Sequence, residues 1–125
     1  MKEEVGFNRL IGIKMIGLQD GVFVLELPIT ENHLHSAGKV HGGVYLLLLD
    51  TVMSRALHSS VEGERLGATV EIKTNFLRPC AGGVIRAEGK LVHGGRRINY
   101  LESELYDEEN NLLAKASGSF MFLDI

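Results

Sequence analysis

Cysteine, tryptophan and proline are scarce in this chain, whose 125 residues include one Cys, no Trp and two Pro. The single cysteine, Cys80, excludes a framework of intramolecular disulfide bonds and is typical of a reducing compartment, so we expect a cytoplasmic protein. Long hydrophobic runs are also lacking, because the longest, residues 44–49, is far too short to cross a bilayer. The N-terminal residues contain no apolar segment, so we expect no secretory signal and no membrane partner.

An excess of charge of one sign is absent as well. The formal net charge is −3 at pH 7, and the basic residues form no cluster, which argues against nucleic acid as the main partner. The length fits one domain, residues 1–125, with a single sizeable core. We therefore expect a soluble, single-domain protein whose main partner is not a nucleic acid.

The pattern of apolar residues predicts two helices and six strands. Residues 2–10 are expected to form a short amphipathic helix with Val5, Phe7 and Leu10 facing inward. Asp20-Gly21 is a strong signal for a tight turn between two strands. The other expected elements are strands at 11–18 and 22–28, a loop at 29–40, a long helix at 41–58, a polar connection at 62–65, and strands at 67–77, 84–93, 97–106 and 112–122. In the strand at 67–77, Val70, Ile72, Thr74 and Phe76 alternate with Glu71, Lys73 and Asn75. This order predicts an α+β fold, a curved antiparallel sheet wrapped around one long central helix.

The segment 41–58 is apolar on most sides, as expected for a helix enclosed by other structure. On a helical wheel, Gly43, Asp50 and Ser54 fall within about 60° of one another, so one stripe of the helix is small and polar. Asp50 has two interpretations at this point. It either faces solvent or pairs with a neighbour such as Arg55, or it is a nucleophile or general base whose basicity rises through partial desolvation.

Two glycines, Gly42 and Gly43, begin this helix although glycine is a poor helix former. Either they permit tight packing, or they let a carbonyl oxygen approach the unpaired N–H groups of the first turn. The second arrangement is an oxyanion hole. Ser54, one turn after Asp50, is positioned either to hold a water beside the carboxylate or to bond back to the helix.

Histidines flank the loop that precedes the helix. His35 and His41 are candidates for donating to a substrate or orienting a neighbour, although a loop histidine is more often structural. A metal site built from His33, His35 and His41 has no supporting Cys pair or carboxylate at ligand spacing, so we expect no metal.

At this point two motifs carry a resemblance. His41-Gly42-Gly43, followed after six residues by Asp50, resembles the HGG-x6-D signature of hotdog-fold acyl-CoA thioesterases of the PaaI-like, 4-hydroxybenzoyl-CoA thioesterase-related family. The segment 75–79, Asn-Phe-Leu-Arg-Pro, is also similar to the strand end of that family. The resemblance covers nearly the whole chain and implies the hotdog fold.

The resemblance implies a role for each matching position. Asp50 matches the carboxylate that attacks the thioester or activates water, and Gly42 matches the residue whose N–H polarises its carbonyl. Ser54 matches a residue that holds the hydrolytic water. Thr69 lies near a hydroxyl position on the following strand. His35 stands where the family usually has Asn or Gln, which puts the pH profile in question.

The same resemblance implies hydrolysis of acyl-CoA by a homodimer, often assembled into a homotetramer, with Asp50 of one subunit facing Gly42 of the other. Coenzyme A is then part of the substrate, and no separate cofactor is expected. The expected substrate-binding residues are Gly43, Thr69, Asn75, Arg78 and Arg97, with Lys73 and Arg96 as further candidates for the phosphates. Two alternatives remain open, a non-catalytic domain that senses acyl-CoA and a hotdog dehydratase or hydratase.

Overall fold

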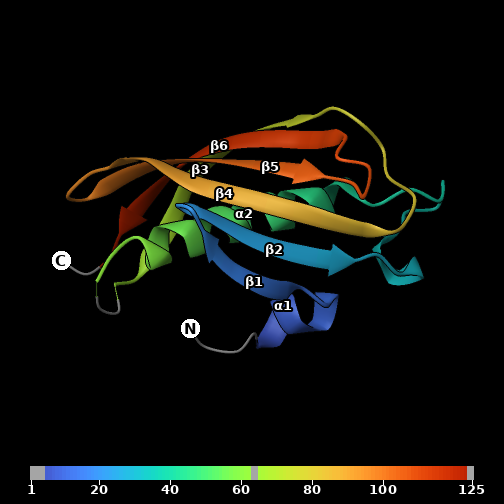
Figure 1. Cartoon of the computed structure of the whole chain (residues 1–125), viewed down its shortest axis with the longest axis horizontal. Helices are drawn as coiled ribbons and strands as arrows, with labels where there is room; N and C mark the ends of the chain where they lie inside the picture. The colour runs from blue at the N-terminus through green and yellow to red at the C-terminus, as the bar shows by residue number, and fades with distance from the viewer. Residues whose placement is uncertain (1–4, 63–64, 124–125) are drawn as a thin grey trace.

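The computed structural model describes residues 5–62 and 65–123 as a curved sheet around one long helix (Figure 1). The elements are α1 (Gly6–Ile11), β1 (Lys14–Gln19), β2 (Val22–Pro28), the 3-10 helix η1 (Glu31–His33), α2 (Gly42–Ser59), β3 (Gly67–Phe76), β4 (Val84–Gly94), β5 (Ile98–Tyr106) and β6 (Leu112–Phe122). The strand order is β1-β2-β4-β5-β6-β3, and every neighbouring pair is antiparallel. The predicted fold class is therefore confirmed.

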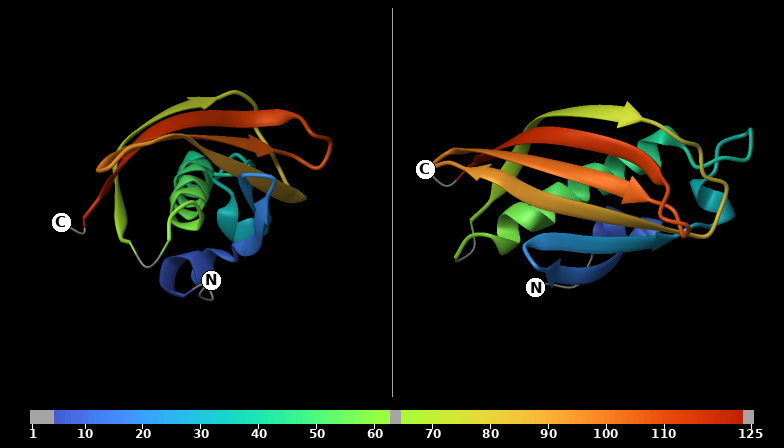
Figure 2. Two further views of the ribbon diagram at one scale, coloured as in Figure 1. Left: turned by 60° about the vertical axis from the view of Figure 1, so that its left-hand side comes forward. Right: turned by 45° about the horizontal axis from the view of Figure 1, so that its top comes forward.

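The sheet covers the apolar surface of α2 by curling around the helix (Figure 2). One face of the helix is buried, and the side chains that face it from the strands are almost completely inaccessible. This core contains Tyr45, Leu48, Leu49, Val52, Met53, Ala56 and Leu57 of α2 and Phe23, Leu25, Leu27, Ile85, Ala87, Leu101, Leu105, Leu113 and Phe120 of the sheet. Within the described residues, no helix has both the length and the apolar character needed to cross a bilayer.

The predicted hairpin at the start of the sheet is confirmed. Asp20 and Gly21 both have positive φ angles, 51° and 80°, as a two-residue I′ turn requires. The alternation predicted for residues 22–28 is also present, because Phe23, Leu25 and Leu27 are fully buried.

The prediction for the N-terminal helix is wrong in its orientation. Val5, Phe7 and Leu10 are 73%, 61% and 80% exposed, and α1 begins only at Gly6, while residues 2–4 lie outside the described residues. The segment attaches through its C-terminal end instead, where Ile11 packs on the core and Ile13 is buried. Six residues make fewer than two helical turns, which is too short to present a continuous apolar face. The contact between α1 and the core is therefore made by the end of the helix that leads into β1.

The strand β3 departs from simple alternation because a bulge separates Thr69 from Glu71. One extra residue in a bulge reverses the faces of the residues that follow it. Thr69 before the bulge hydrogen-bonds α2 through its hydroxyl, and Ile72 after the bulge packs on the core. The prediction that Val70 shares a face with Ile72 is wrong, because Val70 lies in the bulge and is 57% exposed. Gly63 and Glu64 of the predicted polar connection before this strand lie outside the described residues.

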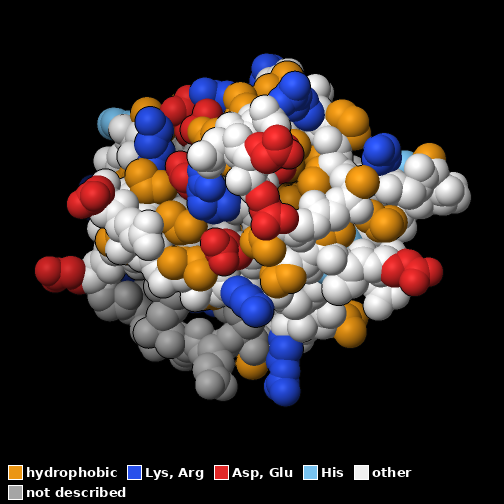
Figure 3. Space-filling model, turned by 45° about the vertical axis from the view of Figure 1, so that its right-hand side comes forward, with side chains coloured by type: hydrophobic (Ala, Val, Ile, Leu, Met, Phe, Trp, Pro, Cys, Tyr) orange, Lys and Arg blue, Asp and Glu red, His pale blue; other side chains and the backbone are white. Residues whose placement is uncertain are grey.

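Both signs of charge are interspersed on the surface, as the space-filling view of one face shows (Figure 3). On the strands, Arg86 pairs with Glu88 at 2.8 Å and Lys115 with Glu104 at 3.6 Å. Partly exposed pairs of this kind contribute little to stability. The fold therefore depends mainly on the packing between the sheet and α2.

That packing is closest where β4 and β5 pass α2. Gly89 of β4 lies so near the helix that an added Cβ would be 2.7 Å from the carbonyl oxygen of Val52. Ser103, which pairs with Gly89 in the sheet, donates a hydrogen bond of 3.1 Å to the carbonyl of Leu49. The two strands thus hold the middle of the helix through its backbone.

We predict that Gly89→Ala lowers the free energy of unfolding by about 1–3 kcal/mol, because the new methyl group overlaps backbone atoms that cannot rotate away. Gly82→Ala is the matched control, since nothing lies within 4 Å of its added Cβ. It should change stability by less than about 1 kcal/mol. Denaturant unfolding of both variants measures the difference, and equal stabilities would contradict the close contact.

The last turn of α2 meets the start of β3 through His58, whose Nε2 accepts the N–H of Gly67 at 3.3 Å. Burial, and secondarily the charge of Arg55, lowers the pKa of His58 from its ordinary value. Below about pH 6.5, His58 is therefore protonated more readily in the unfolded state than in the folded state.

We predict that stability falls as the pH decreases below about 6.5, and that His58→Gln reduces this fall. Glutamine keeps an acceptor for the Gly67 N–H but does not titrate. Thermal unfolding of both proteins between pH 5 and pH 8 tests the prediction. Identical pH dependence in the two proteins would show that His58 contributes nothing to it.

Candidate active site

The helix α2 is capped at its N-terminus by the side chain of His41. The Nδ1 atom of His41 accepts the N–H of Gly43 at 2.8 Å, and the backbone carbonyl of His41 accepts the N–H groups of Val44 and Tyr45. Because Nδ1 is an acceptor, the proton of the neutral ring lies on the exposed Nε2. Sequence reasoning identified His41 as a site residue but not as the cap.

These contacts leave the N–H of Gly42 free. Across residues 5–62 and 65–123 it has no hydrogen-bond partner, and Gly42 lines a groove at the start of the helix. We call this the helix-start groove; its volume is about 380 Å³, and it is lined by His35, Lys39, Val40, Gly42, Tyr45, Phe76, Leu77, Arg78 and Pro79. An unpaired N–H at the positive end of a helix dipole favours a partly negative oxygen. This arrangement has the elements of an oxyanion hole.

Tyr45 forms the inner wall of the helix-start groove. Its hydroxyl donates to the carbonyl of Arg78 at 2.9 Å, and its ring is stacked with that of Phe76 at a centroid distance of 6.2 Å. Burial raises the pKa of Tyr45 to about 12, and the nearby Cys80 and Asp107 add to the effect. The hydroxyl is therefore a stable donor at any ordinary pH.

Asp50 lies about two turns further along the helix, half-buried in a second groove. The hydroxyl of Thr69 donates to its Oδ1 at 2.7 Å, which orients the carboxylate and leaves lone pairs on both oxygens. This Asp50 groove has a volume of about 500 Å³ and is open; it is lined by Gly43, Leu46, Leu47, Asp50, Thr69, Val70, Glu71 and Ile72.

Gly42 and Asp50 do not meet within one chain. Eight residues separate them, and at 1.5 Å per residue this is roughly 12 Å along the helix axis. They also line different grooves. A single carbonyl group therefore cannot contact both in the isolated chain.

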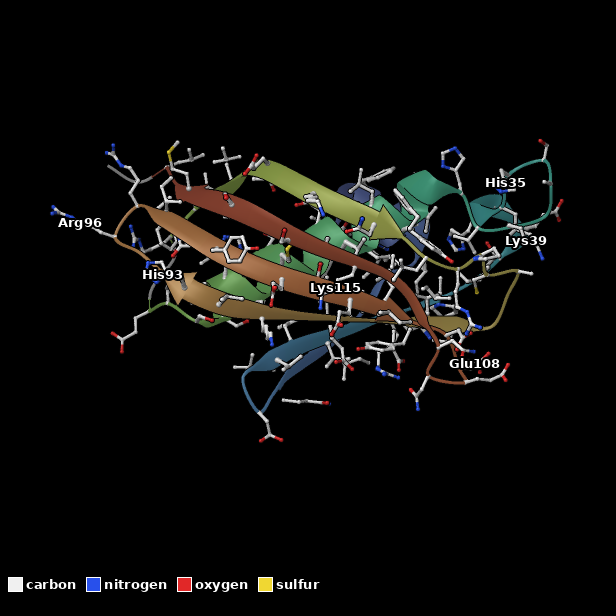
Figure 4. The ribbon with its side chains drawn as sticks, turned by 90° about the horizontal axis from the view of Figure 1, so that it is seen from above. His35, Lys39, His93, Arg96, Glu108 and Lys115 are labelled. Carbon is white, nitrogen blue, oxygen red and sulfur yellow. The ribbon has the colours of Figure 1, made fainter. Side chains whose placement is uncertain are left out.

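The other predicted site residues divide between the two grooves and the remaining surface. His35 and Arg78 line the helix-start groove, and Gly43 and Thr69 line the Asp50 groove, whereas Ser54, Asn75 and Arg97 line neither. The amide oxygen of Asn75 accepts from Lys73 at 3.2 Å. Figure 4 shows Arg96, the neighbour of Arg97, at the opposite end of the sheet from His35 and Lys39.

The three histidines of the loop have separate structural partners. Buried His33 accepts the N–H of Thr30 at Nδ1, and its Nε2 lies 2.7 Å from the carbonyl of Ile11. His35 accepts the N–H of Ala37 at Nδ1. The Nδ1 atom of each of the three rings therefore accepts a hydrogen bond from a backbone N–H.

Sequence reasoning missed several lining residues, among them Tyr45 and Lys39 of the helix-start groove. Tyr45 follows Gly42 by three residues, so helical spacing places both on one face, and this signal was available. Lys39 belongs to an irregular loop, where no periodicity indicates the direction of a side chain.

Comparison with known proteins gives a consistent result. A family model described as the thioesterase superfamily matches residues 37–114. The chain is similar to the structure of conserved protein PA5202 from Pseudomonas aeruginosa, with 32% identity, a TM-score of 0.89, and coverage of 96% of this chain and 95% of that one. It is 28% identical to 1,4-dihydroxy-2-naphthoyl-CoA hydrolase of Listeria monocytogenes over 87% of this chain and 89% of the relative.

The structure of the Escherichia coli PaaI protein, from the phenylacetic acid degradation operon, shares the fold at 23% identity. Its TM-score is 0.85, and the match covers 93% of this chain and 83% of that one. Together with the curved sheet and the long helix, these matches confirm the predicted resemblance to PaaI-like hotdog proteins. This chain belongs to the thioesterase superfamily.

Proposed function

We propose that this protein hydrolyses acyl-CoA thioesters to a free carboxylic acid and coenzyme A. Membership of the thioesterase superfamily supports thioester hydrolysis in general. The observation that carries the finer proposal is that one helix, α2, bears both the free N–H of Gly42 and, about two turns later, the carboxylate of Asp50 held by Thr69. A relative named as a naphthoyl-CoA hydrolase supports coenzyme A as the leaving group.

Gly42 acts on the carbonyl oxygen of the thioester. As the carbonyl carbon becomes tetrahedral, negative charge develops on this oxygen, and a preorganised N–H stabilises that charge more than it stabilises the ground state. The absence of a side chain at Gly42 allows the oxygen to approach closely. The Nε2–H of His41 and the ring of His35 are nearby donors for the same substrate.

Asp50 supplies the base or the nucleophile. In the general-base route, Asp50 accepts a proton from water, and the water oxygen forms a bond to the acyl carbon. The C–S bond then breaks, and the proton passes to the coenzyme A thiolate. In the nucleophilic route, an oxygen of Asp50 forms a bond to the acyl carbon, the C–S bond breaks and coenzyme A leaves as its thiolate. Water then hydrolyses the mixed anhydride to the free acid and Asp50, and a proton from this water neutralises the thiolate. Ser54, one turn along the helix, is suited to hold the water in either route.

The active unit in this proposal is a homodimer. Because Gly42 and Asp50 lie roughly 12 Å apart along one helix, a complete site requires Gly42 from one subunit and Asp50 from the other. A C2 dimer then contains two equivalent sites. Further assembly into a homotetramer is part of the same proposal.

Coenzyme A binds as part of the substrate, and its phosphates require cations. Arg78 is the best-placed candidate because it lines the groove beside Gly42. Arg97 lies at the opposite end of the sheet from this groove. Its neighbour Ile98 pairs with Met121 near the end of β6, whereas Phe76 of the groove pairs with Ala114 near the start of β6. Arg97 therefore serves a coenzyme A molecule only if the assembly brings it to a partner's groove.

We predict that Asp50→Asn lowers kcat for acyl-CoA hydrolysis by at least about 100-fold, because an amide is neither a base nor a nucleophile at this position. Thiol release from short, medium, long and aryl acyl-CoAs, measured for both proteins, tests the proposal and begins to define the acyl group. Acyl-CoA binding without thiol release in either protein would instead indicate a sensor. Full activity in the variant would overturn the role of Asp50.

We predict that Gly42→Pro lowers kcat by roughly 100- to 1000-fold, because proline removes the N–H donor. The first position of a helix tolerates proline, and His41 already has the extended φ and ψ, −61° and 137°, that a residue before proline adopts. Gly42→Ala separates the donor from the space beside it, since it keeps the N–H and its Cβ makes an ordinary contact of 3.7 Å with Phe76, so kcat should fall less than in Gly42→Pro. Assays of thiol release measure kcat for both variants, and equal losses would contradict the role of the N–H.

Mixing the two inactive variants tests the shared site. In a mixed dimer of Asp50→Asn and Gly42→Pro chains, one of the two sites regains both an intact Asp50 and an intact Gly42. After statistical exchange of subunits, activity should recover to about a quarter of the wild-type value. No recovery despite proven subunit exchange would contradict a site shared between subunits.

A further inference from the structure

We propose that Tyr45 is a positioning residue that holds Phe76 and Arg78 opposite Gly42 and thereby sets the affinity for acyl-CoA. This inference rests on the proposed function and adds a residue that does not touch the reacting atoms. Tyr45 connects the start of α2 to the end of β3 through its ring and to the segment after β3 through its hydroxyl. These are the two sides of the helix-start groove.

The hydroxyl of Tyr45 completes the support of Arg78. The backbone N–H groups of Leu77 and Arg78 both donate to the carbonyl of Leu113, at 2.9 and 3.0 Å, which ties this segment to β6. Tyr45 then holds the carbonyl of Arg78 from the side of α2. The backbone of Arg78 is therefore held on both sides. This restricts the positions that its exposed guanidinium can take and lowers the entropy cost of binding an anion.

The ring of Tyr45 supports Phe76 in the same way. The two rings are nearly parallel, with an interplanar angle of 20°, and Tyr45 is only 4% exposed. Phe76 is 56% exposed and lies next to Gly42, since an added Cβ at Gly42 would be 3.7 Å from its Cε1. A buried ring therefore fixes an exposed ring beside the free N–H.

The hydroxyl is a constant donor over the pH range of an assay, because burial raises the pKa of Tyr45 to about 12. Replacing it therefore removes one hydrogen bond and no charge. The contribution of that bond is isolated by Tyr45→Phe, which keeps the ring and its stacking with Phe76. Gly42 and Asp50 are unchanged in this variant, so the chemical step should proceed at its normal rate.

The experiment compares KM and kcat of wild type and Tyr45→Phe for the best acyl-CoA of the panel. We expect KM to rise about three- to ten-fold, the effect of one net hydrogen bond, with kcat unchanged within about two-fold. Tyr106→Phe is the matched control, because the Tyr106 hydroxyl also has a partner, Glu104 at 3.0 Å, and burial likewise raises its pKa to about 12, but it lines neither groove. It should change neither constant.

A double-mutant cycle with Arg78→Ala tests whether Tyr45 acts through Arg78. If it does, Tyr45→Phe should raise KM by less than two-fold in the Arg78→Ala background, because the side chain that it positions is gone. An unchanged KM in Tyr45→Phe, an equal rise in Tyr106→Phe, or full additivity with Arg78→Ala would each overturn the inference.

Direct binding separates this inference from the proposed function. Calorimetry with coenzyme A alone should give a Kd that is about three- to ten-fold weaker for Tyr45→Phe than for wild type, whether or not hydrolysis occurs. Loss of activity in Asp50→Asn together with an unchanged Kd in Tyr45→Phe would overturn the role of Tyr45 alone. Full activity in Asp50→Asn would overturn the proposed mechanism and leave the Kd comparison decisive for Tyr45. No binding of coenzyme A by wild type would overturn both.

Discussion

The closeness with which β4 and β5 approach α2 is the constraint on which the rest of the structure depends. At Gly89 the strand touches the helix backbone, and Ser103 adds a hydrogen bond to the carbonyl of Leu49, the residue before Asp50. A helix held through its backbone has little freedom to rotate or slide, because packed interiors resist small displacements. The remaining strands curl around this fixed axis. Because α2 cannot rotate, the direction in which each of its side chains points is fixed as well.

A rigid helix also fixes the distances between its functional groups. The free N–H of Gly42 belongs to the helix end, where backbone donors lack partners, whereas Asp50 belongs to the middle, where only side chains are available for chemistry. A helix supplies both kinds of group but cannot bring them together, because its rise per residue is constant. The proposed dimer solves this problem by placing the end of one helix beside the middle of another.

Most of the fold was predictable because local patterns and global packing agree. The strands at 22–28 and 112–122 have the predicted bounds, and the predicted helix 41–58 differs by one residue at each end. The errors fall where local pattern is uninformative. A short N-terminal amphipathic segment does not encode which end docks, and the bulge at Thr69 depends on the pairing of β3 with β6, which lies more than forty residues later.

The sequence by itself determined the strands and α-helices, their order, the helix that carries Asp50 and the glycine pair at its start, because periodicity, turn residues and helix-terminus signals act over a few residues. It gave no sign of η1, which lies within the predicted loop at 29–40. Tertiary structure alone decided which groups meet. It brought Thr69 to Asp50 and Tyr45 to Arg78. These contacts join residues 19 and 33 positions apart, and they depend on how strands curve around a helix, which is a property of the whole packed structure rather than of any segment.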